Sequence, residues 1–495
     1  SIGTYAFSGC TGLRQAFLNA GTESIGSYAF HGCTSLAVMP LPSTLRTLGN
    51  GAFQGCSALP DIDLPEGVLS IGSLAFYGCS SLIRVEVPAS TATILERAFD
   101  GCPRLLEISV ADGSAAFASR DGILFNLSMT ELIRHPGGRT GTCTVPDGVR
   151  HIGNYAFNGQ AGLTRIVLPA TLESIGQYAF NGCTGLVDIR LPDPVFSVGH
   201  YAFNGCTGLR TVQLGASLES IGNYAFSGCA GLTDIVFPDG LRTLGIGAFL
   251  NCARLTDIAV PASVTSIQER SFDGCSRLMT IQVAEDNSAY AGRDGVLMNK
   301  TGTVLLQYPG GRFGSYAVPD GVNSIANYAF NGHSGITAVA FPDSLASIGH
   351  YAFNKCPDLN NAPLPGSILS IGNYAFNGCD GLSSLALGEN LTTLGSYAFS
   401  GCTRLANVHI PGTVSTVGSG AFYGCTGLEE AIIADGVATI GSYAFYGCTG
   451  LSAVRIPASV TSIQERAFDG CSSLPAISVS DENAAYSSLD GVLFS

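Results

Sequence analysis

The sequence is poor in charged residues, and basic residues are the scarcer kind. Only 12% of the 495 residues are charged, and 23 Lys and Arg stand against 37 Asp and Glu, for a formal net charge of -14. No basic cluster occurs, which argues against a nucleic-acid partner, because such a partner requires a basic stripe that neutralises phosphates. No apolar run within the sequence is long enough to span a bilayer, and nothing resembles a signal peptide.

The common signatures of enzymes are also missing. The seven histidines show no His-Glu-x-x-His spacing, and there is neither a P-loop nor a dinucleotide-binding glycine fingerprint. Asp61 and Asp63 form an isolated Asp-x-Asp that lacks the other oxygen ligands of a calcium site, so a solvated strand face is the simpler interpretation. We therefore expect a non-catalytic protein without cofactor or metal.

The sequence begins inside a repeat, SIGTYAFSGC, without an initiator methionine, and it stops inside another, DGVLFS. We expect it to be a fragment of a longer chain. The missing targeting segments and anchors therefore say nothing about location.

The chain does contain a fixed period. Phenylalanines recur every 23 residues in three runs, at 7, 30, 53, 76 and 99, from 157 to 272, and from 330 to 468. Two intervals of 58 residues separate the runs, so the interruptions also repeat. A period of 20 to 29 residues with a leucine-rich strand signature predicts a solenoid, in which each repeat is one coil and no coil can bury its apolar face alone. No linker divides the chain, so we expect one continuous solenoid.

Residues 220–240, SIGNYAFSGCAGLTDIVFPDG, show how one repeat is built. The two-residue step from Ile235 to Phe237 puts both side chains on one face of a short strand. Pro238 lacks the amide donor that a strand needs, so it marks the strand exit. Leu241 and Leu244 begin the return limb of the coil.

An aromatic spine and an aromatic stripe follow from comparing the repeats. The Ala-Phe pair is nearly uniform, which predicts that the phenylalanines stack in the core. Two residues before each Phe, the chain carries Tyr224 in one repeat but Gly51, Leu74 or Arg97 in others. A position that tolerates Gly, Leu and Arg is not core, so we expect the tyrosines to form a partly exposed stripe.

Sixteen of the seventeen cysteines stand three residues after the repeated Phe, and Cys143 lies outside this series. A metal site needs three or four converging ligands at short spacing, which the series lacks. Disulfides between adjacent coils fit the expected separation of about 5 Å, but the first two runs hold five cysteines each, and an odd run cannot pair completely. Gln160 and His333 replace Cys after the long intervals. A ladder of buried free thiols is the favoured interpretation, and adjacent disulfides and metal remain alternatives.

The pattern I-G-x-Y-A-F-x-G-C-x-x-L-x-x-I-x-[LVF]-P resembles the BspA-like leucine-rich repeat of bacterial surface antigens and large protist families. The resemblance implies a β-rich solenoid, a right-handed leucine-rich repeat coil with short parallel strands. It also implies a surface-exposed or secreted adhesion and interaction protein. The motif is a scaffold signature without universal ligand residues, so fold is better supported than function.

The long intervals, 119–149 and 292–322, resemble the D-G-V-L-[FM]-N hairpin module that interrupts such arrays, and a third copy begins at Asp490. Residues 123–125 and 131–134 read as two strands joined by a polar loop. The expected order is repeats in 1–102, a hairpin-containing unit in 103–149, repeats in 150–275, a second such unit in 276–322, repeats in 323–471, and the start of a third in 472–495.

A variant repeat precedes each module, with Arg in place of Tyr and Asp after Phe. We expect Arg97, Arg270 and Arg466 to pair with Asp100, Asp273 and Asp469 and so to fit the altered coil. An anion-binding site is the alternative.

The outward strand positions, eight and ten residues after Phe, vary while the scaffold does not, which suits protein recognition. We predict one polar strip of Asp188, Arg190, Asp234 and Asp257 that binds an extracellular or host protein, on a chain that is itself a monomer. The alternatives are glycan binding along the tyrosine stripe and a role as a spacer for a domain outside the fragment. The stripe comprises Tyr155, Tyr178, Tyr201 and Tyr224, for which packing between coils is the simpler interpretation.

Overall fold

The computed structural model describes residues 1–495, and the chain divides into two compact units. The first unit holds residues 1–253 and 266–271, and the second holds residues 254–265 and 272–495. Strands and turns make up both units, and neither contains a helix of the length and apolarity needed to cross a bilayer.

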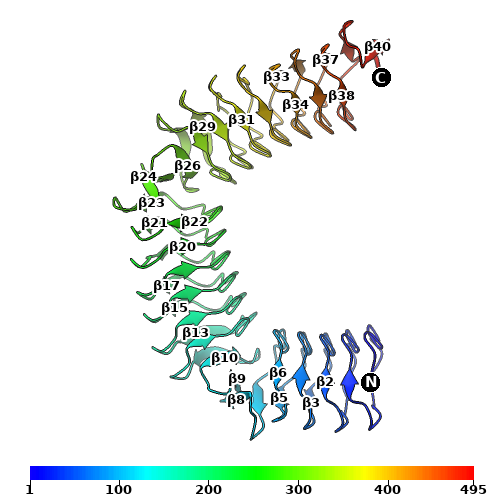
Figure 1. The fold of residues 1–495 in the computed structure, drawn as a ribbon, viewed down its shortest axis with the longest axis vertical. Helices are drawn as coiled ribbons and strands as arrows, with labels where there is room; N and C mark the ends of the chain where they lie inside the picture. Colours follow the sequence, from blue (N-terminus) through cyan, green and yellow to red (C-terminus); the bar gives the residue numbers. More distant parts are fainter. The chain divides into compact units, whose positions relative to one another are not determined.

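Each repeat forms one coil, most coils carry two short strands, and successive coils of a unit lie side by side (Figure 1). In repeat 220–240, β18 (Ser220–Ile221) pairs in parallel with β20 (Thr243–Leu244) of the next coil. In the same repeat, β19 (Asp234–Ile235) pairs in parallel with β17 (Thr211–Gln213) of the coil before. The second strand ends before Pro238, as the sequence predicts. The return limb was not predicted to form a strand, yet its Ser-Ile and Thr-Leu pairs build a second sheet along the array.

The first unit contains four sheets. The first array is the run of repeats before the first long interval. Its return-limb strands are β1 (Ser24–Ile25), β2 (Thr47–Leu48), β4 (Ser70–Ile71) and β6 (Thr93–Ile94). The other strand of each coil, which we call the outward strand, is present as β3 (Asp61–Ile62), β5 (Arg84–Val87) and β7 (Glu107–Val110). A nine-stranded sheet holds β8 (Phe117–Arg120), β9 (Ile123–Asn126), β10 (Glu131–Arg134), β12 (His151–Ile152), β14 (Ser174–Ile175), β16 (Ser197–Val198), β18, β20 and β22 (Ser266–Ile267). A five-stranded sheet holds β11 (Gly141–Thr144), β13 (Leu163–Val167), β15 (Asp188–Arg190), β17 and β19.

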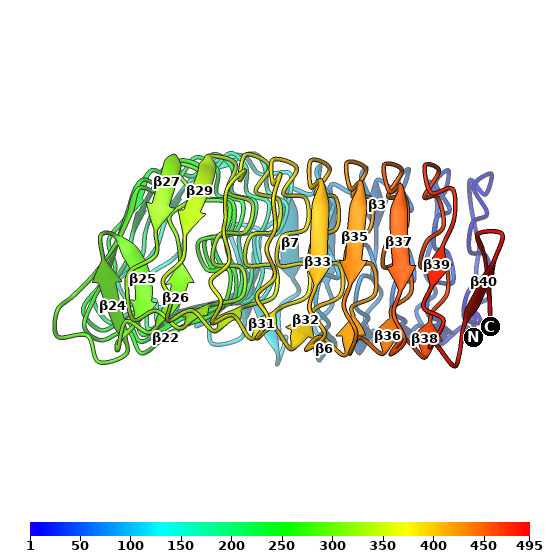
Figure 2. The same ribbon diagram turned by 90° about the horizontal axis from the view of Figure 1, so that it is seen from above.

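The second unit repeats this plan. Its ten-stranded sheet holds β24 (Tyr290–Arg293), β25 (Val296–Asn299), β26 (Val304–Gln307), β28 (Ser324–Ile325), β30 (Ser347–Ile348), β31 (Ser370–Ile371), β32 (Thr393–Leu394), β34 (Thr416–Val417), β36 (Thr439–Ile440) and β38 (Ser462–Ile463). The outward strands are β21 (Asp257–Val260) with β23 (Thr280–Val283), β27 (Gly314–Ala317) with β29 (Ile336–Ala340), and β33 (Asn407–Ile410), β35 (Glu430–Ile433), β37 (Ala453–Ile456) and β39 (Ser478–Val479). A hairpin of β40 (Ser487–Leu489) and β41 (Val492–Phe494) is the last element. Figure 2 shows β33, β35 and β37 side by side.

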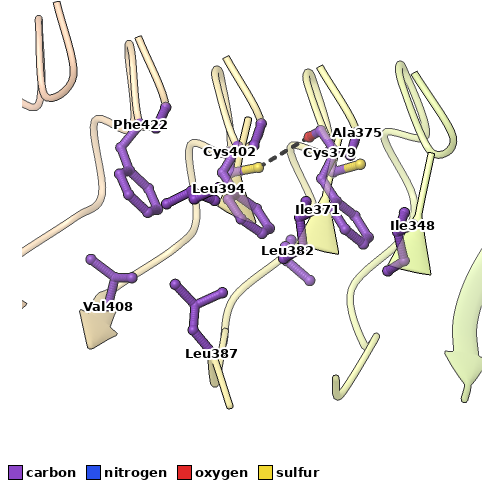
Figure 3. Packing of buried hydrophobic residues seen from close by; sticks show 14 of the residues in the cluster. Ile348, Ile371, Ala375, Cys379, Leu382, Leu387, Leu394, Cys402, Val408 and Phe422 are labelled. Atoms are coloured by element: carbon purple, nitrogen blue, oxygen red, sulfur yellow. Dashed lines mark hydrogen bonds between the residues drawn. The ribbon is translucent and has the colours of Figure 1, made fainter. Parts of the chain in front are cut away.

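The repeated phenylalanines stack through the core, as predicted. The ring of Phe203 lies 5.0 Å from those of Phe180 and Phe226, at interplanar angles of 3° and 4°. All three side chains are fully buried, and each burial contributes roughly 1.5 to 3 kcal/mol. Figure 3 shows the same arrangement in the second unit, where Leu382 and Phe422 belong to one apolar cluster.

The series cysteines lie beside this spine as thiols. The Sγ of Cys206 donates a hydrogen bond of 3.1 Å to the backbone carbonyl of Phe180 on the preceding coil. Cys402 makes the corresponding bond in the second unit, drawn as a dashed line in Figure 3. Burial raises the pKa of Cys252 to about 12, so its thiol stays protonated near neutral pH. Cys10 is exposed and Cys471 is half-buried. This arrangement fits the predicted ladder of buried thiols.

The position two residues before Phe has a left-handed backbone, which the sequence analysis did not predict. The φ angles of Tyr178 and Tyr201 are 54° and 56°, a region that costs a side chain of order 1 to 3 kcal/mol. Glycine takes this position at Gly51 and Gly247, with φ angles of 59° and 57°. A Cβ at Gly247 would lie 2.6 Å from the Tyr224 ring, so glycine here accepts the ring of the coil before.

Each long interval contains antiparallel strands. In the first unit, β9 pairs antiparallel with both β8 and β10, and β10 then pairs in parallel with β12 of the following array. The loop between β9 and β10 is closed by Asn126, whose Oδ1 accepts hydrogen bonds from the backbone N–H groups of Thr130 and Glu131. In the second unit, β24, β25 and β26 repeat this pattern, and Asn299 closes the loop. We call these segments the first and second modules.

The modules also explain why Cys is replaced after each interval. The ring of His135 stacks 4.9 Å from Phe157 and so takes the place of a spine phenylalanine. Gln160, at the Cys position, lies 2.7 Å from His135 Nδ1 and donates a hydrogen bond to the His135 carbonyl. In the second unit, His333 Nε2 lies 3.1 Å from the Pro309 carbonyl. A longer polar side chain at this position therefore ties the array to the module.

Candidate protein-binding face

The outward strands of the first unit present one side chain to the core and the next to solvent. In β15, Ile189 is buried while Asp188 and Arg190 are exposed. This alternation follows from the two-residue period of a strand with one buried face. The scaffold therefore fixes the direction of these two charged side chains, whatever their identity.

Pairing between strands places three of the four predicted strip residues on one sheet. Asp188 is in register with Thr211, and Thr211 with Asp234, so the two carboxylates lie in one column with a threonine between them. Arg190 lies in the neighbouring column, opposite Gln213. Neighbouring strands are about 4.8 Å apart. No ion pair joins the side chains of Asp188, Arg190 and Asp234.

Asp257, the fourth predicted residue, belongs to the second unit. Its strand β21 pairs with β23, and Thr280 Oγ1 donates a hydrogen bond of 2.8 Å to its carboxylate. The structure thus brings Asp188, Arg190 and Asp234 together on one sheet and assigns Asp257 to the other unit. A strip of all four residues stays a prediction.

The same face holds charged residues that the sequence analysis left out of the strip. Arg165 is in register with Asp188 and so extends the column by one coil. Its position eight after Phe157 was the available signal. In the first array, Asp61, Arg84 and Glu107 form a second column in register, with charges that alternate in sign.

The predicted tyrosine stripe is a stack of half-buried rings. Tyr155, Tyr178, Tyr201 and Tyr224 follow one another at 4.9, 4.6 and 4.9 Å between ring centroids, with interplanar angles of 4°, 4° and 17°. The Arg97 guanidinium lies 5.2 Å from the Tyr155 ring at one end, and Gly247 lies against Tyr224 at the other. Each ring face is therefore covered by a neighbour. No ring face of this stripe is free for a sugar to stack on. The stripe therefore favours packing between coils over glycan binding.

The arginine of the first variant repeat pairs with its aspartate, as predicted. Arg97 Nε lies 3.2 Å from Oδ2 of the buried Asp100. Arg134 of the first module lies 2.5 Å from Oδ1 of the same carboxylate, an ion pair that the sequence analysis missed. Asn158 donates a third contact, of 2.7 Å, to Oδ2. Two guanidinium groups thus share this one buried carboxylate, and the anion site stays an untested alternative.

The corresponding pair at the last variant repeat is looser. Arg466 Nε lies 3.8 Å from Asp469, and both side chains are more than half exposed. The pairing holds here too, but without the buried partners that surround Asp100.

A comparison with protein families decides the assignment. The BspA type leucine-rich repeat region matches in six copies, over residues 1–120, 142–288, 310–429 and 393–489. The chain belongs to the BspA-type leucine-rich repeat family. The matched ranges leave out residues 121–141, with two of the three strands of the first module, and residues 289–309, with all three strands of the second.

Solved structures of leucine-rich repeat proteins resemble this BspA-type chain. One from Eubacterium ventriosum is 24% identical, covers 77% of this chain and 98% of its own, and has a TM-score of 0.61. The pneumococcal vaccine antigen PcpA is 23% identical over 74% of this chain and 87% of its own, with a TM-score of 0.48. A leucine-rich cell surface protein from Faecalibacterium prausnitzii is 24% identical over 90% and 87%, with a TM-score of 0.43. No curated protein matches the sequence significantly.

Membership of this family sets the broad class of function. Leucine-rich repeat solenoids are generally non-catalytic scaffolds that bind other proteins through extended surfaces. The outward strands of this BspA-type chain form an extended surface that carries the charged columns.

Proposed function

We propose that this protein is a non-catalytic adhesion scaffold, on the cell surface or secreted, that binds an extracellular protein through the outward strands of its first unit. The observation that carries the proposal is the register of β13, β15, β17 and β19. It aligns Arg165, Asp188, Thr211 and Asp234 in one exposed column on a rigid sheet.

The chemistry of the column indicates the partner. The column holds, in order, a guanidinium, a carboxylate, a hydroxyl and a second carboxylate, and the chain as a whole carries a formal charge of -14. A partner with a basic patch would be steered to this face, with an affinity that weakens as salt screens the charges over a Debye length of about 8 Å at physiological ionic strength. A flat, repeated surface distributes binding over several residues, so no single residue is indispensable.

Location at the surface is part of the proposal and rests on family membership. BspA-type repeats are typical of surface-exposed and secreted proteins, and a surface adhesin would present a long sheet face to other molecules.

The test is a binding screen against purified extracellular proteins, run beside a glycan array. The proposal expects a protein ligand whose affinity falls when Asp188, Arg190 and Asp234 are all replaced by serine. A ligand found only on the glycan array, or a protein ligand indifferent to the triple replacement, would contradict it. Retention of the parent melting temperature by the triple variant is the control for folding.

A further inference from the structure

A pocket of about 230 Å³ lies in the first unit where the first module leaves the solenoid. It is bounded by the coil around Glu96 and Arg97, by Glu131 and Arg134 of the module, and by Asn154 and Tyr155 of the following coil. Leu95 and Glu96 are exposed at this pocket, whereas Asp100 and Arg134 are buried. Pockets for drug-sized ligands measure roughly 300 to 1,000 Å³, so this pocket is of the size for one small ring.

The buried Arg134 side chain in the lining of this pocket has donors without a partner in the protein. The side chain of Arg134 is 6% exposed, and its Nη1 donates to the Tyr155 carbonyl at 2.6 Å. Its Nε–H makes no hydrogen bond and is fully enclosed by the protein. Its Nη2 also makes no hydrogen bond within the chain but, unlike Nε, is not fully enclosed. Leaving a buried polar group unsatisfied costs roughly 1 to 3 kcal/mol, and more for a charged group. Because Nε is enclosed, Nη2 is the arginine donor that an acceptor in the pocket can reach, and the chain supplies no acceptor for it.

Acceptors in the same pocket also lack full partners. The Glu131 carboxylate is half-buried and forms no hydrogen bond or ion pair with the protein. Glu96 accepts one hydrogen bond, of 2.9 Å, from Asn154. Leu95 and Ile133 add apolar surface beside these groups. A ligand that suits this lining must accept a hydrogen bond from Arg134, donate to the carboxylates and cover an apolar patch.

The charges of the lining select among ligands. Three carboxylates, Glu96, Asp100 and Glu131, stand against Arg97 and Arg134, for a formal charge of -1 (two positive, three negative). This balance disfavours a phosphate or carboxylate ligand. The lining also disfavours a cationic side chain of a partner, because that side chain would face the unpaired donor of the positively charged Arg134. Hydroxyl groups both donate and accept, so a neutral polyol satisfies donor and acceptors together.

We propose that this pocket binds one sugar residue, either as a free monosaccharide or as the end of a glycan. The second module offers an internal contrast, because Val304 and Gln307 stand there where the first module has Glu131 and Arg134. The same fold is thus built without the carboxylate and the guanidinium, so the sugar site is specific to the first module. The residues of the second module also indicate two substitutions that the fold accepts, Glu131→Val and Arg134→Gln.

The test uses the full chain and four probes, glucose, galactose, mannose and N-acetylglucosamine, at millimolar concentration in saturation-transfer NMR and calorimetry. At least one sugar is expected to bind, and Glu131→Val and Arg134→Gln are each expected to weaken its binding at least tenfold. Glu219→Val, which removes an exposed carboxylate elsewhere in the first unit, is expected to leave binding unchanged. Melting temperatures of all variants show whether they fold. Glu131→Val leaves the Asp100 ion pairs intact and so separates binding from stability.

Three results would overturn the proposal. The first is the absence of binding by every probe, and the second is binding that Glu131→Val does not change. The third is binding of methylguanidine in place of the sugars, which would assign the pocket to a basic side chain of a partner. The affinity for the free monosaccharide is then compared with the affinity for the same sugar at the end of an immobilised glycan. This comparison distinguishes the two sources of the ligand, a free monosaccharide and a glycan end.

Discussion

The side chain of Asn158 donates a hydrogen bond of 2.7 Å to the buried carboxylate of Asp100, 58 residues earlier in the chain. Asn181 donates in turn to Asn158, and Asn204 to Asn181, each at 2.8 Å. The ladder of asparagines therefore begins on the aspartate of the variant repeat. This contact joins the two arrays of the first unit directly, although a whole module separates them in sequence.

Removing this carboxylate should destabilise the first unit strongly. We expect Asp100→Ala to lower the free energy of unfolding by about 3 to 5 kcal/mol, because it leaves the buried Arg134 and the half-buried Arg97 without their counter-ion. Chemical denaturation monitored by circular dichroism measures the change. The matched control is Asp469→Ala, whose side chain is 60% exposed in an equivalent repeat and should cost less than about 1 kcal/mol. Equal losses of unfolding free energy in Asp100→Ala and Asp469→Ala would show that the burial of Asp100 is not the cause of the destabilisation.

The pH dependence of stability should report on His135. Burial lowers the pKa of His135 to about 4, whereas an unfolded histidine titrates near 6.5. Between these values the unfolded state binds more protons, so the contribution of His135 is complete above pH 6.5 and is lost as the pH falls towards 4. The lowered pKa of His135 corresponds to a contribution on the order of 3 kcal/mol to the free energy of unfolding.

The control for this prediction is His135→Tyr, which introduces the residue that the second module carries at Tyr308. Denaturation of parent and variant between pH 7 and pH 4 should show a smaller loss of stability for the variant. Burial lowers the pKa of His333 as well, so part of the pH dependence of stability should remain in the His135→Tyr variant. Identical pH profiles for the two proteins would rule out His135 as a source.

Alkylation should distinguish buried thiols from disulfides. In the native protein we expect iodoacetamide to modify Cys10 readily and Cys471 slowly, because only these two thiols are accessible. Burial and the raised pKa values protect the interior cysteines, such as Cys252, from reaction as thiolates. Under denaturing, non-reducing conditions, intact mass spectrometry should find every cysteine alkylated. Adducts missing in pairs would instead indicate disulfides between coils.

The sequence predicted the regular part of the fold because one period governs it. A residue such as Phe203 recurs every 23 residues, so its neighbours in space are its own counterparts in adjacent repeats. The return strand was missed because a pair such as Ser220–Ile221 is too short to show a two-residue alternation. The left-handed backbone at Tyr201 was also missed, although glycine at the equivalent Gly51 and Gly247 was a usable signal.

The candidate site was harder to predict, because its contacts do not follow the period. Arg134 reaches Asp100 from inside the module, where no repeat spacing relates them. Arg165 could have been found from its position eight after Phe157, because the strip residues Asp188 and Asp234 occupy the same position in their repeats. Asp234 and Asp257 fall in different units, a division of the chain that an unbroken period does not reveal.

The central claim is that the outward strands of the first unit bind a protein, and affinity for a confirmed partner tests it most directly. The measurement is surface plasmon resonance at low and high salt on the parent and on the variant with Asp188, Arg190 and Asp234 replaced by serine. Phe226→Ala is the stability control, which should cost about 3 to 5 kcal/mol because its side chain is fully buried. The account predicts that the triple variant keeps the parent melting temperature and binds at least tenfold more weakly at low salt, with a smaller salt dependence. A triple variant that binds the partner as tightly as the parent at low salt would contradict it.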